Sequence, residues 1–135
     1  MKKKWLLITI LVAGALVAWL CFNPPRRFGW CRFGLTTYGA MPRLVSDIQV
    51  RADGAVRKVP KTHELPLEQV QWLLDSAPET LIVSIGWNGA VEPDERIWKL
   101  KSVEVKILKS KEAAQLFNRL KKEGRRVAIH FHSTC

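Results

Sequence analysis

APETLIVSIG, residues 77–86, carries the strongest indication of the fold. Its centre, Leu81–Ile85, is an apolar run rich in β-branched side chains, which begins after Pro78 and ends at Gly86. The run is too short for an ordinary helix and has the composition of a strand covered on both faces. We therefore expect it to be the central strand of the folded part.

Strand-like and helix-like segments alternate around this central strand. Val103–Leu108 and Val127–Phe131 have strand patterns, and apolar residues recur at helical spacing across Pro66–Ser76 and Lys111–Lys122. Asp53-Gly54, between two apolar runs, is a strong hairpin signal. This alternation predicts parallel strands joined by crossover helices. The expected fold is α/β, a small mixed β-sheet with crossover helices on both faces plus a β-hairpin, preceded by one transmembrane helix.

The N-terminus carries a basic head and a long uncharged run. Residues 1–4 include three lysines, and residues 5–22 carry no charge. As a helix, the uncharged run would be about 27 Å long, which is enough to cross a bilayer. The small-x-small pattern Ala13-Gly14-Ala15 lies inside the run, so we expect an uncleaved signal-anchor rather than a cleaved signal peptide. Residues 23–43 are expected to form a spacer and lead-in, and residues 44–135 the domain.

The chain is basic, with a formal net charge of +10. From Arg96 to Arg126 there are eleven Lys or Arg residues and three Glu residues. Such a surface suits anionic lipid, an acidic protein partner or plain solvation, whereas nucleic-acid binding is disfavoured because no recognition motif is present. Lys2–Lys4 favour an N-terminus kept inside and hence an extracytoplasmic domain, although Arg26 and Arg27 on the other flank oppose this orientation.

The C-terminal half resembles the Mth-type domain family, which includes the adipogenesis-associated Mth-domain protein and the mitochondrial complex I assembly factor three. The resemblance covers about Ser46–Cys135. It rests on four separated motifs: Pro78-Glu79-x-Leu81-Ile82-Val83, Leu108-x-Ser110-x-x-Ala113-Ala114-x-x-Phe117-Asn118, Glu123-Gly124-Arg125-Arg126-Val127-Ala128 and Phe131-His132-Ser133-Thr134-Cys135.

The resemblance implies a small mixed α/β sheet, no established catalytic activity and no known cofactor, with roles in assembly or regulation through protein contacts. Fold carries over more safely than function. The chain departs from the family in two places. Ser84 stands where the family usually has the first glycine of a Gly-x-Gly pattern, and the N-terminal membrane anchor is an addition.

Two segments are candidates for binding. Gly86-Trp87-Asn88-Gly89 follows the central strand, where open α/β sheets place ligand crevices, and Trp87 could form a wall of such a site. The loop lacks the Lys-Ser/Thr of a phosphate-binding loop, so a plain tight turn is the alternative. Arg125 and Arg126 follow Gly124 at a helix end, where they either serve the helix dipole or bind an anion such as a carboxylate.

His130, His132 and Cys135 are weak candidates for metal ligands. Alternate strand residues share a face, but only three ligands are visible and no fourth stands at the usual spacing. We therefore expect no metal and no cofactor, and histidines that make ordinary hydrogen bonds. No catalytic residue is assigned, because the candidate nucleophiles have no partner pattern. They are Cys31, Cys135, Ser84 and Ser133.

Together these features predict a membrane-anchored, non-catalytic interaction or assembly-type domain with a basic C-terminal face. Its expected partners are the membrane, through residues 5–22, a protein, and anionic lipid. The alternative is a small-molecule binding or catalytic domain with its site at the Gly86–Gly89 loop.

Overall fold

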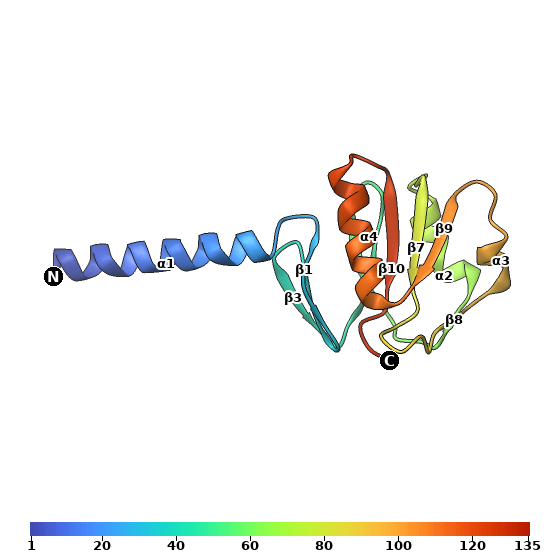
Figure 1. Ribbon diagram of the computed structural model, residues 1–135, viewed down its shortest axis with the longest axis horizontal. Coiled ribbons are helices and arrows are strands. Elements are labelled where there is room, and N and C mark those ends of the chain that lie inside the picture. Colours follow the sequence, from blue (N-terminus) through green and yellow to red (C-terminus); the bar gives the residue numbers. More distant parts are fainter.

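The computed structural model describes residues 1–135 and contains a five-stranded mixed sheet with helices on both faces (Figure 1). The strand order is β5-β4-β10-β7-β9. β7 is parallel to β9 and β10, whereas β4 is antiparallel to β10 and β5. This confirms the predicted α/β fold. The strands are β4 (Asp47–Val50), β5 (Val56–Val59), β7 (Thr80–Ser84), β9 (Glu104–Leu108) and β10 (Val127–Phe131).

The predicted central strand is β7, and all five of its residues are buried. Ile82 packs into the core on one face of the sheet, and Leu81 and Val83 pack into the core on the other face. Because both faces are covered, the strand reads as an uninterrupted apolar run instead of an alternating pattern. The hairpin at Asp53-Gly54 joins β4 to β5, as predicted.

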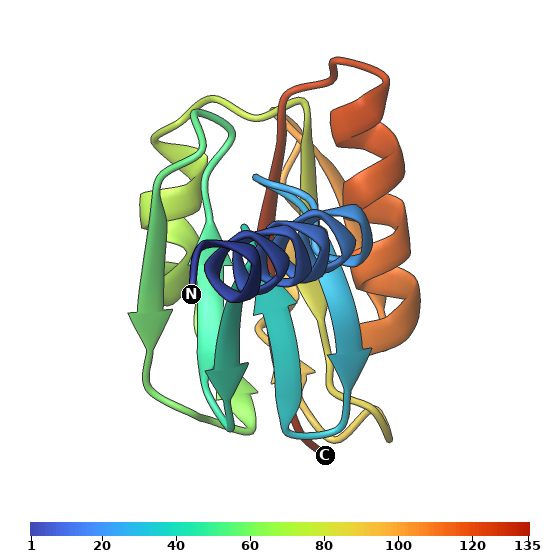
Figure 2. The ribbon, with the colours of Figure 1, turned by 90° about the vertical axis from the view of Figure 1, so that its left-hand side faces the viewer.

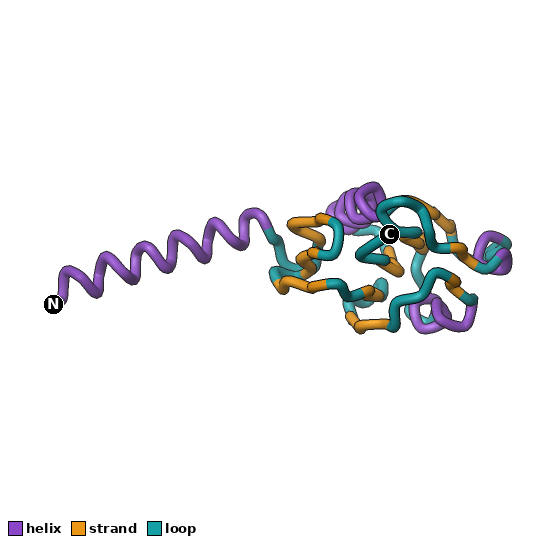
Figure 3. The backbone as a smooth tube through the Cα atoms, turned by 90° about the horizontal axis from the view of Figure 1, so that it is seen from below, coloured by secondary structure: helices purple, strands orange, loops and turns teal.

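Three helices cover the sheet. α4 (Ser110–Lys122) packs on one face, and α2 (Leu67–Leu74) and the short α3 (Glu95–Trp98) belong to the core of the other face. Figure 3 shows α4 and α2 on opposite sides of the strands. A parallel two-stranded pair, β6 (Glu64–Leu65) with β8 (Glu92–Pro93), lies on the α2 and α3 side of the molecule.

A second, three-stranded antiparallel sheet precedes the main sheet. It consists of β1 (Phe28–Arg32), β2 (Leu35–Tyr38) and β3 (Met41–Leu44). Phe28 is 2% exposed and lies 5.4 Å from the ring of Phe117 and 4.8 Å from that of Phe131. β1 therefore packs against the core of the main sheet, and it lies within residues 23–43, which the sequence predicts as a spacer and lead-in.

The strands of this small sheet escape sequence analysis for a physical reason. The pairing of β1 with β2 shifts register between Phe28 and Cys31, so the two residues of β1 that face the core, Phe28 and Cys31, are three positions apart instead of two. β1 is tied to α4 by Asn118, whose side chain bonds both the N–H and the carbonyl of Phe28, at 2.8 Å and 2.7 Å. The attachment is thus long-range and leaves no local pattern.

α1 (Lys2–Phe22) extends away from the domain, and none of its residues is buried (Figure 1). By length and composition it is apolar enough to cross a membrane. Its end is fixed to the small sheet. The Trp19 indole N–H donates to the carbonyl of Ala40 at 3.1 Å, and the side chain of buried Asn23 accepts from the Trp30 N–H and the Thr37 hydroxyl.

Replacement of Phe28 tests whether the small sheet is part of the core. Phe28→Ala is expected to lower the free energy of unfolding by about 3–5 kcal/mol, because it removes a buried ring and leaves a cavity in the core. Phe33→Ala is the control, since Phe33 is 60% exposed and its loss should change stability by no more than about 0.5 kcal/mol. Urea unfolding in mild detergent gives both values, and equal values for the two variants would contradict this packing.

Candidate functional site

Residues 132–135 follow β10 and run past the carboxyl end of β7, at the lower edge of the sheet (Figure 1). The indole N–H of Trp87 donates to the carbonyl of Ser133 at 3.1 Å, and the Trp87 backbone N–H donates to that of Thr134 at 3.2 Å. The Ser110 hydroxyl donates to the carbonyl of His132 at 2.7 Å. We call residues 132–135 the C-terminal segment, and these bonds fix its path.

Gly86 is required where this segment passes. It has a φ of +92°, and a Cβ at this position would lie 2.3 Å from the carbonyl oxygen of Cys135. Only glycine satisfies both conditions. Ser84, which departs from the family pattern, is buried two residues earlier, and its hydroxyl lies 3.0 Å from the Ser110 hydroxyl.

The carboxylate of Asp47, at the start of β4, organises the same region from the neighbouring strand. It is buried, and its Oδ1 accepts from the Ser133 N–H at 2.9 Å and from the Lys61 ammonium at 3.1 Å. Its Oδ2 lies 2.6 Å from Nδ1 of His132. Burial would raise the pKa of Asp47, but the bonds from His132, Ser133 and Lys61 outweigh it and lower the pKa to about 2. The carboxylate is therefore ionised.

Three potential metal-ligand atoms converge beside this carboxylate. A ring nitrogen of His63, a ring nitrogen of His132 and the sulfur of Cys135 all lie within 4.8 Å of one another. His63 Nε2 is 3.4 Å from Cys135 Sγ. His63 lies in the exposed loop between β5 and β6, whereas His132 is fully buried. We call His63, His132 and Cys135 the donor cluster; two imidazoles and a thiol can bind a soft or borderline metal or pair as base and nucleophile.

His130, which the sequence grouped with His132 and Cys135, is not part of the donor cluster. It lies on the α2 side of β10, where its Nδ1 is 3.1 Å from Nε2 of Gln49. The same Gln49 amide donates to the carbonyl of Gln69 at 2.9 Å, so His130 Nδ1 accepts and its Nε2 carries the proton. His130 is thus a buried structural residue that is hydrogen-bonded to Gln49.

The other predicted site residues have partners within the chain. The Trp87 backbone and indole N–H groups both bond the C-terminal segment, and Asn88 is exposed in the loop that follows. The Arg126 guanidinium donates to the carbonyls of Ser76 and Ala77, next to the end of α2. Arg125 lies 3.5 Å from the carboxylate of Glu79. Binding through these residues stays a prediction.

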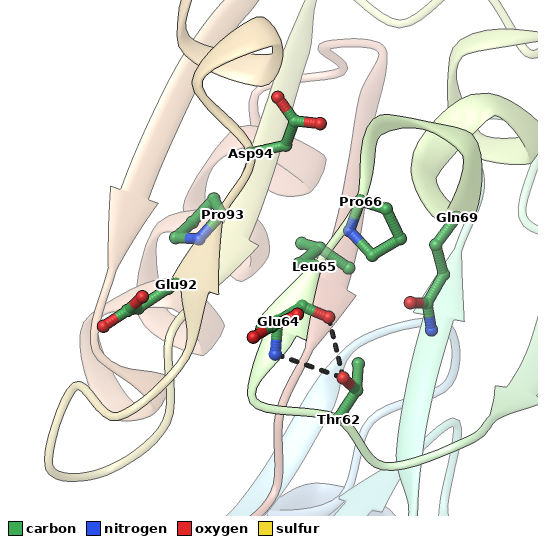
Figure 4. A pocket seen from close by; sticks show the side chains of 8 residues that line it. All are labelled: Thr62, Glu64, Leu65, Pro66, Gln69, Glu92, Pro93 and Asp94. Atoms are coloured by element: carbon green, nitrogen blue, oxygen red, sulfur yellow. Dashed lines mark hydrogen bonds between the residues drawn. The ribbon is translucent and has the colours of Figure 1, made fainter.

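Several surface hollows complete the description. One of about 570 Å³ is lined by residues of β6, β8 and the start of α2, and Figure 4 shows its mostly polar lining. Its side chains serve local structure: the Thr62 hydroxyl bonds both backbone groups of Glu64, and Asp94 caps α3 by accepting from the Arg96 N–H at 2.8 Å. A second hollow of about 420 Å³ is lined by Trp30, Cys31, Arg32, Trp87 and Lys111.

Sequence analysis missed Asp47, Lys61 and His63. These residues lie between 72 and 86 positions from their partners in the C-terminal segment, so no local spacing connects them. The motif ending in His132-Ser133-Thr134-Cys135 was visible in the sequence. What it contacts follows only from the antiparallel pairing of β4 with β10, which brings Asp47 beside residue 132.

The buried imidazole of His130 makes stability depend on pH. Burial lowers the pKa of His130 to about 4, whereas an exposed histidine in the unfolded chain has a pKa of about 6.5. Between these values the unfolded chain binds a proton that the folded chain does not. The contribution of neutral His130 to the free energy of unfolding should therefore be fully present above pH about 6.5. The free energy of unfolding should fall by up to about 3 kcal/mol as the pH decreases to about 4.

Urea unfolding of the wild type and of His130→Gln across this pH range measures the effect. The variant has no titrating side chain at this position, so its stability should fall less steeply with acidification. Parallel curves for the two proteins would show that His130 does not titrate as its burial requires.

Comparison with known proteins agrees with this architecture. No protein-family model matches the chain, and no curated protein matches it. Among solved structures, an outer membrane protein from Bartonella henselae superposes with a TM-score of 0.67 at 18% identity, covering 84% of this chain and 99% of that protein. A Bordetella pertussis protein described as an Mth938-like domain has a TM-score of 0.55 at 19% identity, with coverage of 80% and 85%. These two share the fold.

MT938 is more similar in sequence. It is 32% identical to this chain and superposes with a TM-score of 0.67. The match covers 81% of this chain and 98% of MT938, and therefore essentially the whole of that domain. The chain belongs to the Mth938-like domain family, a family of unknown function.

Proposed function

We propose that the protein is a single-pass membrane protein whose Mth938-like domain is a non-catalytic interaction domain held against anionic lipid. The observation that carries this proposal is a basic hollow beside the end of α1. It has a volume of about 460 Å³ and is lined by Pro25, Arg26, Arg27, Lys121 and Lys122. We call its four basic residues, Arg26, Arg27, Lys121 and Lys122, the juxtamembrane cluster.

The cations of the juxtamembrane cluster are not neutralised by ion pairs within the chain. None of the four side chains takes part in any of the ion pairs of the structure. Burial and then the nearby charge of Arg26 lower the pKa of Lys121, and the smaller opposing effect of the Asp53 carboxylate does not offset them. Like charges that are gathered without a partner favour an external anion. At the end of a membrane-spanning helix, the nearest anions are the phosphates and carboxylates of lipid headgroups.

The small sheet supports the same orientation. Figure 2, which looks along α1 from its N-terminal end towards the domain, shows the strands of this sheet in front of the main sheet. The side of the domain that faces α1 therefore includes β1–β3 and their turns. Several large apolar side chains of this region are more than half exposed: Trp30, Phe33, Met41, Leu44 and Val45. Exposed apolar side chains beside cations are typical of surfaces that rest on a bilayer.

The joint between helix and domain is short and specific. Asn23 follows α1 directly, and its side chain donates to the Trp19 carbonyl while it accepts from the Trp30 N–H and the Thr37 hydroxyl. A Cβ at Gly29 would lie 2.3 Å from the Asn23 side-chain oxygen, so Gly29 permits this approach. A membrane-spanning α1 would thereby set the orientation of the domain. A protein partner, which the family resemblance implies, stays a prediction.

Membrane integration is tested by alkaline carbonate extraction of membranes from cells that express the full chain. The wild type should stay in the pellet. Val12→Lys/Leu16→Lys should move it to the supernatant, because each charge at the centre of a spanning helix costs about 2.5–3.5 kcal/mol. Trp98→Lys, which also adds a charge at an exposed apolar position but in α3, is the control and should stay in the pellet. Extraction of the wild type would refute the anchor.

Lipid contact is tested with the full chain in nanodiscs of phosphatidylcholine, with or without phosphatidylserine. The rate at which an amine reagent modifies Lys121 and Lys122, followed by mass spectrometry, should fall when phosphatidylserine is present and recover in high salt. Lys101 follows α3, which lies at the far end of the domain from α1 (Figure 1). Lys101 should therefore react at the same rate in nanodiscs with and without phosphatidylserine.

Two variants separate lipid contact from general charge. Arg26→Gln/Arg27→Gln should reduce the protection of Lys121 by roughly tenfold or more, since each basic side chain near an anionic surface contributes about 1 kcal/mol. Lys99→Gln/Lys101→Gln removes the same charge near α3 and should leave the protection intact. Equal reactivity of Lys121 in the two kinds of nanodisc would contradict the proposal.

A further inference from the structure

We propose that the donor cluster, His63, His132 and Cys135, binds a zinc ion. The nitrogen and sulfur donors of these residues lie within 4.8 Å of one another. Imidazole nitrogen and thiolate sulfur are the ligands that zinc prefers in proteins. Two histidines and one cysteine would supply three ligands and leave the fourth position of a tetrahedral site to water.

The buried imidazole of His132 supports this inference independently of the proximity of the donors. His132 is fully buried, and its Nε2 has no hydrogen-bond partner anywhere in the chain. A buried polar atom without a partner costs about 1–3 kcal/mol. A metal ion bound to Nε2 would remove this cost. A ring nitrogen of His132 lies within 4.8 Å of the donors of His63 and Cys135, and Nε2 is the one that Asp47 leaves without a partner.

Asp47 prepares His132 to act as a ligand. Its carboxylate lies 2.6 Å from Nδ1 of His132. The Nδ1–H group therefore donates a hydrogen bond to the carboxylate, and Nε2 is the ring nitrogen that can bind a metal. Carboxylate, histidine and metal in this order are the usual arrangement around zinc-bound histidines, where the carboxylate fixes the ring and makes it more basic. The ammonium of Lys61, 3.1 Å from Asp47, balances the carboxylate charge. The Cys135 thiolate would then supply the negative charge of the zinc site.

The geometry requires only a small contraction. At normal bond lengths, the ligand atoms of a tetrahedral zinc site are about 3.3–3.6 Å apart. The pair His63 Nε2 and Cys135 Sγ is already at 3.4 Å. His63 is exposed in a loop, so its side chain can adjust to the ion and leaves a path for the ion to enter, whereas His132 is held by Asp47. The inference is independent of the membrane proposal.

The test is zinc binding by the full chain, purified in detergent and stripped of metal with a chelator. Competition with a chromogenic chelator measures affinity and stoichiometry, and Co²⁺ reports the ligands through its thiolate charge-transfer absorption. We expect one zinc ion per chain and a Co²⁺ spectrum with one thiolate. His63→Ala should weaken zinc binding by more than the roughly 10–100-fold that loss of a supporting carboxylate causes.

The variants are chosen so that folding does not decide the result. His63 is exposed and Cys135 is partly exposed, so His63→Ala and Cys135→Ser should keep the circular dichroism of the wild type, and Cys135→Ser should also abolish the thiolate band. Cys31→Ser removes a different half-buried thiol and should change neither affinity nor spectrum. Absence of stoichiometric zinc in the wild type, or equal losses for Cys31→Ser and Cys135→Ser, would overturn the inference.

Discussion

The buried carboxylate of Asp47 holds the C-terminal segment in place at the end of the main sheet. It joins the start of β4 to the segment after β10 through the Ser133 N–H and His132, and it holds the Lys61 ammonium beside them. Because a buried charge is tolerated only with such partners, the carboxylate determines where the C-terminal segment lies. The close passage over Gly86 depends on that placement.

The side of the domain next to α1 is organised by apolar packing (Figure 1). Phe28 fills the space between α4 and the main sheet, and Asn118 fixes the backbone of the same residue. This attachment positions the small sheet, and the bonds of Asn23 then attach α1 to it. The polar network around Asp47 therefore positions the C-terminal segment. The packing of Phe28 positions the small sheet and, through it, α1 relative to the domain.

Much of the fold could be predicted because its signals are local. The apolar run of β7, the Asp53-Gly54 turn and the helical spacing of α4 each reflect a period or a turn that a few neighbouring residues define. The small sheet could not be predicted, since the register shift after Phe28 breaks the period and its packing partners Phe117 and Phe131 are distant in the chain. Local patterns therefore identify elements but not an irregular strand pair.

Local sequence patterns are enough to establish an apolar N-terminal helix, a basic C-terminal half and an α/β domain that resembles the Mth938-like family. The contacts among polar residues depend instead on the folded chain. His63 reaches Cys135 across 72 positions, and Asp47 reaches His132 across 85, while His130, two residues from His132, faces a different partner. The physical reason is that strand register, set by the whole core, determines such contacts, and no short-range pattern encodes it.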